Sequence, residues 1–268
     1  MGTWSGRAGT LLMGLQLSVE VEHSHPVAVV RPRGVLDAVN VAELRAALLE
    51  CVAEQPSAAV IDASALKLGD DVALTMLAAV ARETAEWPGT RIALAGASPE
   101  VGAAVERLGV GRYLVIFPDR TSALTQLVPE STPPTRRERI EPDRNAPGLA
   151  RSVVAEFCHE LGVRDHDAAQ LVASELVTNA VIHARTSIDL TLRFLPPLLH
   201  IAVRDRAGGI PRITGIIDES SESGRGLVLV DALATRWGSF VPHGGKVVWA
   251  VVRVQSARWN GWIPHPPA

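Results

Sequence analysis

The chain has 268 residues, which predicts two domains at about 100 to 200 residues per domain. Hydrophobic residues make up 47% and charged residues 21%, which excludes disordered and collagen-like chains. The net charge of -3 provides no basic surface for a nucleic acid or an anionic membrane, so we expect neither partner.

The two cysteines, Cys51 and Cys158, lie far apart and form neither a CxxC motif nor a His-Cys cluster. This pattern indicates a reduced protein without a zinc site. The sequence also has no apolar run near the roughly 18 residues that a membrane helix needs, and its N-terminal apolar run is too short for a secretory signal. We therefore expect a cytoplasmic protein.

The first half of the chain alternates short apolar runs with helical periods, which is typical of an α/β layer structure. Apolar runs predict strands that begin at Val27, Ala58, Arg91 and Tyr113. Capping residues and helical spacing predict helices after Asn40, from about Asp71 to Glu86, and after Ser98.

A stretch with five prolines, residues 128–148, separates the halves and predicts a linker and the entry to a second domain. After two helices, residues 187–194 alternate apolar and polar side chains, which predicts a strand with one buried and one polar face. The chain then turns at Pro196 into an antiparallel strand. A glycine-bearing loop, another helix and a last hairpin follow.

We expect the second half to carry the functional site. The helix at ELVTNAVIHA spaces Glu175, Asn179 and His183 four residues apart, so the three project along one stripe. Such a stripe alone usually lies on a solvated face. Here Asp205 ends a strand, and Gly224-Arg225-Gly226 begins another helix, where backbone amides can approach an anion.

Four motifs together resemble the anti-sigma factor serine kinases of the GHKL ATPase superfamily. They are ELVTNAVIHA, VRDRAGGIP, GRGLVLVDALATRWG and GGKVVWAVV, within residues 139–254. The resemblance implies an α/β sandwich in which helices cover one face of a mixed sheet, and it implies binding of ATP and magnesium. It also suggests dimerisation through the ATP-binding domain.

The resemblance implies a role for each matching residue. Asn179 would bind Mg²⁺, and Glu175 would be the catalytic base for an attacking hydroxyl. Asp205 would accept a hydrogen bond from the adenine amino group. Residues 212–223 would form a lid over the phosphates. The other residues expected to bind the nucleotide are His183, Gly209, Gly224, Arg225, Gly226 and Leu227.

Two residues depart from the family pattern. Ala207 stands where the first glycine box commonly has glycine, and Val247 stands where threonine is frequent near the adenine. Both changes are expected to weaken nucleotide binding. His183 has a second interpretation as a cation that faces the C-terminal dipole of its helix.

The first half resembles the STAS domain of anti-anti-sigma factors through VAVVRPRGVLD, AAVIDAS and LGDDVALTMLAAVARE. In that family an Asp-Ser-Ser-Gly sequence opens the last of these segments, and its first serine receives phosphate. This chain has Asp71 at that position. Asp71 is therefore interpreted either as a helix-capping carboxylate or as an incomplete mimic of the phosphorylated state.

The fold class predicted is α/β, with an N-terminal STAS-like domain and a C-terminal GHKL-type sandwich. The predicted divisions are an N-terminal extension, the STAS-like domain, a linker, the ATPase domain and a tail, at residues 1–13, 14–127, 128–138, 139–255 and 256–268.

The first functional hypothesis is an ATP-dependent protein serine/threonine kinase and anti-sigma factor that acts on STAS-domain partners or a sigma factor. The alternative is an ATP-binding switch or scaffold with little phosphoryl transfer. A histidine kinase lacks support because no phosphoacceptor helix precedes the ATP-binding domain. The tether also predicts contact between the chain's own two domains, because a short linker gives an effective concentration of roughly millimolar.

Overall fold

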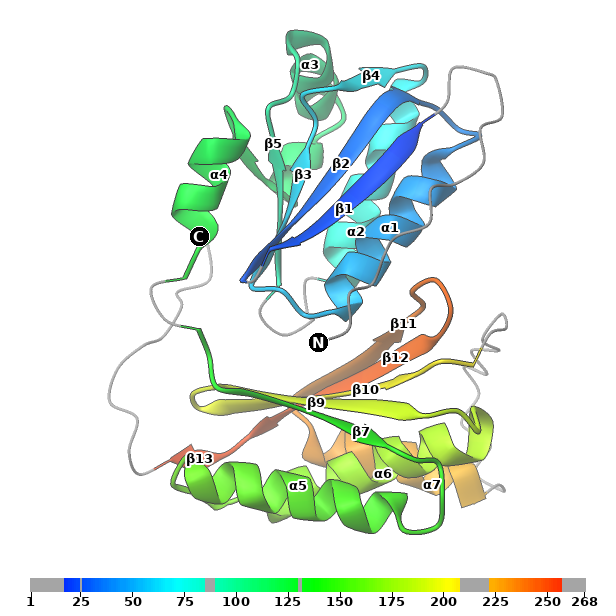
Figure 1. The fold of residues 1–268 in the computed structure, drawn as a ribbon, viewed down its shortest axis with the longest axis vertical. Helices are drawn as coiled ribbons and strands as arrows, with labels where there is room; N and C mark the ends of the chain where they lie inside the picture. The colour runs from blue at the N-terminus through cyan, green and yellow to red at the C-terminus, as the bar shows by residue number, and fades with distance from the viewer. Residues whose placement is uncertain (1–16, 25, 85–89, 130–131, 208–221, 257–268) are drawn as a thin grey trace.

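The structure is a computed structural model that describes residues 17–24, 26–84, 90–129, 132–207 and 222–256. It forms two α/β domains that lie one above the other, joined by the chain after residue 127 (Figure 1). The predicted extension 1–13, most of the predicted lid and the tail beyond residue 256 lie outside the described residues.

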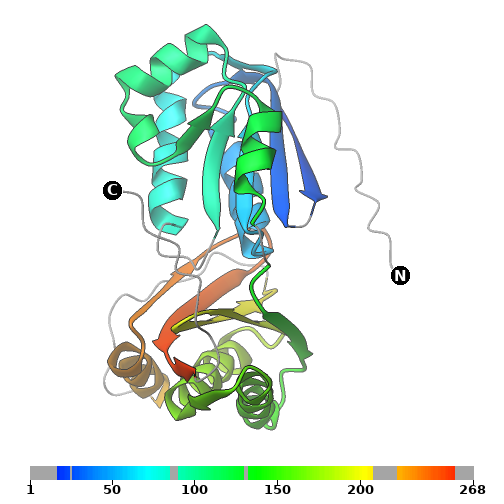
Figure 2. The same cartoon turned by 90° about the vertical axis from the view of Figure 1, so that its left-hand side faces the viewer.

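The N-terminal domain is a largely parallel sheet in the order β1-β2-β3-β5-β6, and only β1 runs antiparallel to its neighbour. Helices α1 and α2 cover one face and α4 covers the other (Figure 2). The strands are β1 Ser18–Ser24, β2 Val27–Leu36, β3 Ala58–Asp62, β4 Leu66–Leu68, β5 Arg91–Ala95 and β6 Val115–Phe117, with β4 paired to β2. The helices are α1 Val41–Ala53, α2 Thr75–Thr84, α3 Pro99–Arg107 and α4 Arg120–Leu127, with 3₁₀ turns η1 Asp71–Leu74 and η2 Val110–Arg112.

Local capping explains where helix α3 begins and ends. The Ser98 hydroxyl accepts a hydrogen bond from the Val101 amide at 3.3 Å, and Pro99 occupies the first turn. Gly109 follows with φ of +66°, a conformation that favours glycine. The next strand begins at Val115, later than the predicted Tyr113, because the chain first forms η2.

The C-terminal domain is a five-stranded sheet in the order β11-β12-β10-β9-β7. Each pairing that the structure describes in it is antiparallel, so the mixed sheet implied by the resemblance is wrong for these residues. The strands are β7 Thr135–Ile140, β9 Ile188–Leu195, β10 Leu198–Asp205, β11 Arg236–Phe240 and β12 Lys246–Arg253. Strand β7 begins inside the segment predicted as a linker. A separate short pair joins β8 Val163–Asp165 to β13 Gln255–Ser256.

Three helices cover one face of this sheet: α5 Ala146–Glu160, α6 Asp167–His183 and α7 Glu222–Leu233 (Figure 1). Along β12, Val248, Ala250 and Val252 belong to the core on the helical side. The alternate residues Val247, Trp249 and Val251 belong instead to the core that includes α1 and α2. The sheet is therefore buried on both faces, by its own helices and by the N-terminal domain.

The polar face predicted for residues 187–194 exists, but most of it is buried. Thr191 is 8% exposed and Arg193 is 5% exposed. The Arg193 guanidinium donates a hydrogen bond to the Gln55 carbonyl of the N-terminal domain. The alternation thus correctly separates apolar from polar side chains, but a second domain takes the place of solvent.

No helix within the described ranges is long and apolar enough to cross a membrane. Both cysteines are buried and free. The described residues also contain no group of three or more His, Cys, Asp or Glu side chains arranged to hold a metal ion.

Candidate functional site

Helix α6 positions the three residues of the predicted stripe. Its apolar side chains, including Leu176 and Val177, are fully buried against the sheet and its neighbours. Glu175 and Asn179 are half-buried one turn apart, and His183 is exposed at the last turn. The amphipathic helix therefore places the carboxylate of Glu175 and the amide of Asn179 at the edge of its buried face.

The beginning of α7 lies against Glu175. A β-carbon added to Gly226 would come within 2.5 Å of Glu175 Oε2, so only glycine allows this approach without a shift. Gly226 is the fifth residue of α7, one turn after the first described residue of the helix. The structure thus brings Glu175 close to the N-terminal turns of a helix, where the helix dipole favours negative charge.

Asp205 ends strand β10 on the helical side of the sheet. Its side chain is buried, with 8% exposure of the residue, and Oδ1 accepts a hydrogen bond from the Ala207 amide at 3.2 Å. Burial raises the pKa of this carboxyl, while the Ala207 hydrogen bond and the charges of Lys246 and His183 act in the opposite direction.

Gly245 and Lys246 were missed as site residues. Lys246 is paired with Asp205 in the β10–β12 register. A β-carbon on Gly245 would come within 2.1 Å of the Asp205 carbonyl oxygen, so this position requires glycine. The hairpin turn at His243-Gly244-Gly245 was a usable signal, because it fixes which residue of β12 lies opposite the end of β10.

The structure does not place Val247 beside Asp205, the residue expected to contact adenine. Val247 pairs with Arg204, is 1% exposed and packs in the core shared with the N-terminal domain. It therefore lies on the sheet face opposite Asp205. Ala207, the other departure, does lie beside Asp205 through its backbone amide.

The remaining predicted residues are only partly described. Gly209 lies outside the described residues. Gly224 and Arg225 are helical residues of α7. The side chain of Arg225 is outside the description, and Leu227 is half-buried.

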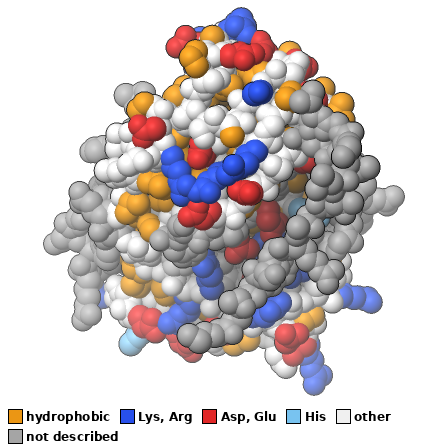
Figure 3. Space-filling model, turned by 45° about the horizontal axis from the view of Figure 1, so that its top comes forward, with side chains coloured by type: hydrophobic (Ala, Val, Ile, Leu, Met, Phe, Trp, Pro, Cys, Tyr) orange, Lys and Arg blue, Asp and Glu red, His pale blue; other side chains and the backbone are white. Residues whose placement is uncertain are grey.

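Asp71 lies apart from these residues. Asp70 is the cap of η1, because its Oδ1 accepts from the Val72 amide at 2.9 Å. Asp71 forms an ion pair with Arg107 of α3, and both side chains are substantially exposed. Helix α3 is at the end of the molecule farthest from α5, α6 and α7 (Figure 1). Viewed toward that end, charges of both signs lie among apolar side chains (Figure 3).

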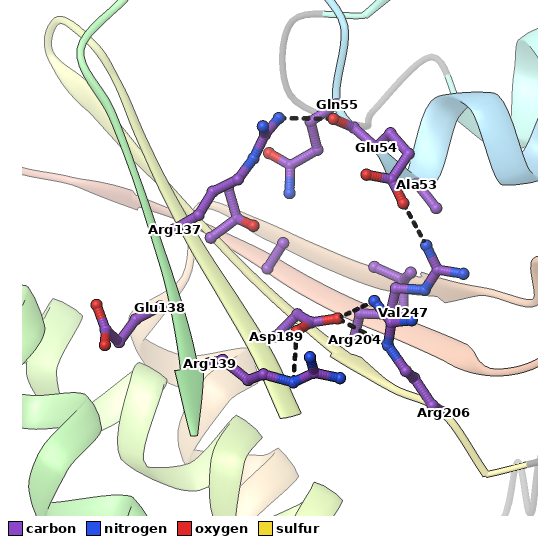
Figure 4. A pocket seen from close by; sticks show the side chains of 12 residues that line it. Ala53, Glu54, Gln55, Arg137, Glu138, Arg139, Asp189, Arg204, Arg206 and Val247 are labelled. Carbon is purple, nitrogen blue, oxygen red and sulfur yellow. Dashed lines mark hydrogen bonds and ion pairs between the residues drawn. The ribbon is translucent and has the colours of Figure 1, made fainter. Parts of the chain in front are cut away.

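A cavity of about 300 Å³ lies between the two domains, on the face of the ATPase-side sheet opposite Asp205. The close view shows guanidinium groups from β7 and β10 around it, with Glu54 and Gln55 from the end of α1 (Figure 4). It is separate from the predicted site.

Comparison with protein families assigns both halves. The STAS domain family matches residues 18–123, and the histidine kinase-like ATPase domain family matches residues 140–251. The chain is therefore a mixed α/β protein of two domains. The chain carries a STAS domain followed by a GHKL-type ATPase domain, as the sequence motifs predicted.

Two solved structures each match less than half of the chain. An anti-sigma factor antagonist from Mycobacterium paratuberculosis is 29% identical over 44% of this chain and 98% of its own, with a TM-score of 0.38. The RsbU and RsbW domains of a Mycobacterium tuberculosis protein are 20% identical over 45% of this chain and 32% of theirs, with a TM-score of 0.33. A search of curated proteins found no match.

Proposed function

We propose that this protein is an ATP-dependent serine/threonine kinase that acts on STAS-domain partners in the control of a sigma factor. The ATPase-domain assignment supports nucleotide binding. The observation that carries the proposal is the contact between Glu175 and the glycine of α7, because it supports a candidate base close to the N-terminal turns of a helix, whose dipole favours phosphate.

The residues present fit a magnesium-bound adenine nucleotide. Asn179 supplies an amide oxygen, a hard ligand of the kind that Mg²⁺ accepts beside phosphate oxygens and water. The space that a β-carbon would fill at Gly226 keeps the backbone of α7 close to Glu175. Asp205 is a buried acceptor, which suits the amino group of adenine and disfavours the carbonyl of guanine.

The proposal gives each side chain a role. Glu175 would accept the proton of the attacking hydroxyl, and Asn179, one turn later, would hold the metal. Asp205 would orient the base, with its own carboxylate held by a hydrogen bond from the Ala207 amide. When bound, Mg²⁺ neutralises charge on the phosphate oxygens.

The test is transfer of labelled phosphate from Mg-ATP to a purified STAS-domain protein that has serine at the position equivalent to Asp71. Glu175→Gln is expected to retain nucleotide binding and lose transfer by about 100-fold or more, since a general base contributes 10²–10⁴-fold. Glu156→Gln, an exposed change on α5, is the matched control and should transfer at the wild-type rate. Equal transfer by Glu175→Gln and the wild type would remove the kinase proposal.

The second candidate is an ATP-binding switch that changes its partner contacts without transferring phosphate. The specific observation that favours it is Asp71, whose charge is already paired with Arg107 where an acceptor hydroxyl would be needed. ATP binding by the wild type together with absence of transfer to any STAS partner would select this candidate.

A further inference from the structure

The contact between the two domains has an apolar part and a charged part. Phe240, Val247, Trp249 and Val251 of the ATPase sheet share one buried core with residues of the STAS domain. Figure 1 shows the end of α1 against this sheet. Because the face is occupied by apolar side chains of both domains, separating them would expose that surface to water.

Arg204 is the centre of the charged part. Its guanidinium donates to Glu50 Oε1 at 2.6 Å and to Glu54 Oε1 at 2.8 Å, and the residue is only 8% exposed. Both glutamates belong to the end of α1 (Figure 4 shows Glu54). A buried guanidinium needs partners, because loss of them leaves a charge without solvent. Docking of α1 therefore fixes the position of the Arg204 side chain.

Arg204 also adjoins Asp205 along strand β10. Successive strand residues point to opposite faces, and here Arg204 lines the interdomain cavity while Asp205 faces the helices. The residue after Asp205 is anchored on the cavity side as well. Arg206 donates to Asp189 Oδ2 at 2.7 Å, and its amide donates to Thr186 at 3.0 Å. Both neighbours of Asp205 are therefore held from the face that the STAS domain covers.

We propose that docking of the STAS domain, acting through Arg204, positions Asp205 and thereby raises the affinity and adenine selectivity of the nucleotide site. The inference rests on the proposed function, since it assumes that Asp205 contacts adenine. Arg204 is a positioning residue in this scheme, because it acts through its neighbour. The coupling is reciprocal, so adenine nucleotide must also tighten docking.

The test is calorimetric titration of the full chain with Mg-ATP and, separately, Mg-GTP. Glu50→Gln/Glu54→Gln removes the two negative charges of the other domain that pair with Arg204, and Arg204→Met removes the guanidinium. Both are expected to weaken ATP binding by roughly 5- to 150-fold and to reduce the preference for ATP over GTP. Glu43→Gln, an exposed change on the same helix, and Arg253→Met, an exposed change in the same sheet, should bind like the wild type.

Hydrogen exchange of the wild-type chain provides a second measurement that needs no variant. ATP is expected to slow exchange of the Glu54 and Gln55 amides at the end of α1, and GTP is expected to do so less. Unchanged ATP affinity and selectivity in the variants, or no ATP-dependent protection of these amides, would overturn the inference alone. If the wild type binds no ATP, the proposed function and this inference fail together.

Discussion

The carboxylate of Glu175 and the α-carbon of Gly226 are so close that a β-carbon would come within 2.5 Å of Oε2. This relationship joins α6 to α7 at the point where the sequence predicted a catalytic base and a phosphate-binding glycine. It has a direct test, because alanine at Gly226 must displace either the carboxylate or the helix.

Gly226→Ala is expected to lower both ATP affinity and phosphate transfer, measured by calorimetry and by labelling of a STAS partner. Gly102→Ala is the matched control, since Gly102 lies within α3 and a β-carbon there meets no atom within 4 Å. That change should raise the free energy of unfolding by about 0.4–1 kcal/mol and leave binding unchanged. Wild-type transfer by Gly226→Ala would show that the contact is dispensable.

A second prediction concerns Asp71. The wild-type chain should acquire no stoichiometric phosphate at Ser64 or Thr75 after incubation with Mg-ATP, measured by mass spectrometry. Asp71→Ser supplies a hydroxyl beside Arg107, and we expect slow phosphorylation of this serine by a second molecule. The physical reason is distance, because α3, which carries Arg107, and the helices α5 to α7 lie at opposite ends of the chain (Figure 1).

Concentration dependence separates the two routes for Asp71→Ser. Transfer between molecules gives an initial rate per molecule that rises with protein concentration, and Asp71→Ala provides the unlabelled control. A rate per molecule that does not change on dilution would mean that the serine reaches Glu175 of its own chain, in conflict with this domain arrangement.

A third prediction concerns acid stability. His200 is 7% exposed on the interdomain face, and neither ring nitrogen has a hydrogen-bond partner among the residues that the structure describes. Its pKa is lowered from 6.5 to about 3, mainly by burial and further by the charges of Arg193 and Arg236. The His200 ring is therefore neutral in the native state. Its contribution to the free energy of unfolding is fully present above pH 6.5, the pKa of histidine in the unfolded chain. It is lost as the pH falls from there toward about 3.

Urea unfolding of the wild type and His200→Leu at pH 8 and pH 5 measures this loss. Linkage predicts that the wild type loses about 2 kcal/mol more than the variant between these pH values. His159→Leu, a change at an exposed histidine of α5, is the control and should follow the wild type. Parallel losses in wild type and His200→Leu would place the ring in contact with water.

The sequence could predict the parts of the site that depend on local periodicity. The spacing of Glu175 and Asn179 defines a helix face, and the hairpin pattern defines Asp205 as a strand end. It could not predict the docking of Arg204 on Glu50, which is 154 residues away, because a charged residue on an alternating strand ordinarily indicates a solvated face. Strand β7 was also missed, since its Thr135–Ile140 segment is mostly exposed and lacks the apolar alternation of a half-buried strand.

The last prediction concerns the cost of keeping Asp205 buried. Burial raises the pKa of its carboxyl, so ionisation of Asp205 opposes folding. The neutral carboxyl contributes to stability at low pH, and this contribution is lost as the pH rises through the raised pKa. Asp205→Asn keeps an acceptor for the Ala207 amide without the charge. At neutral pH it should raise the free energy of unfolding, measured in urea, and lower ATP affinity.

Asp189→Asn, on the opposite face, is the control. It should not raise the free energy of unfolding, because it weakens the ion pair with Arg206. A less stable Asp205→Asn variant would indicate that the native carboxylate is stabilised by its partners more than burial opposes it.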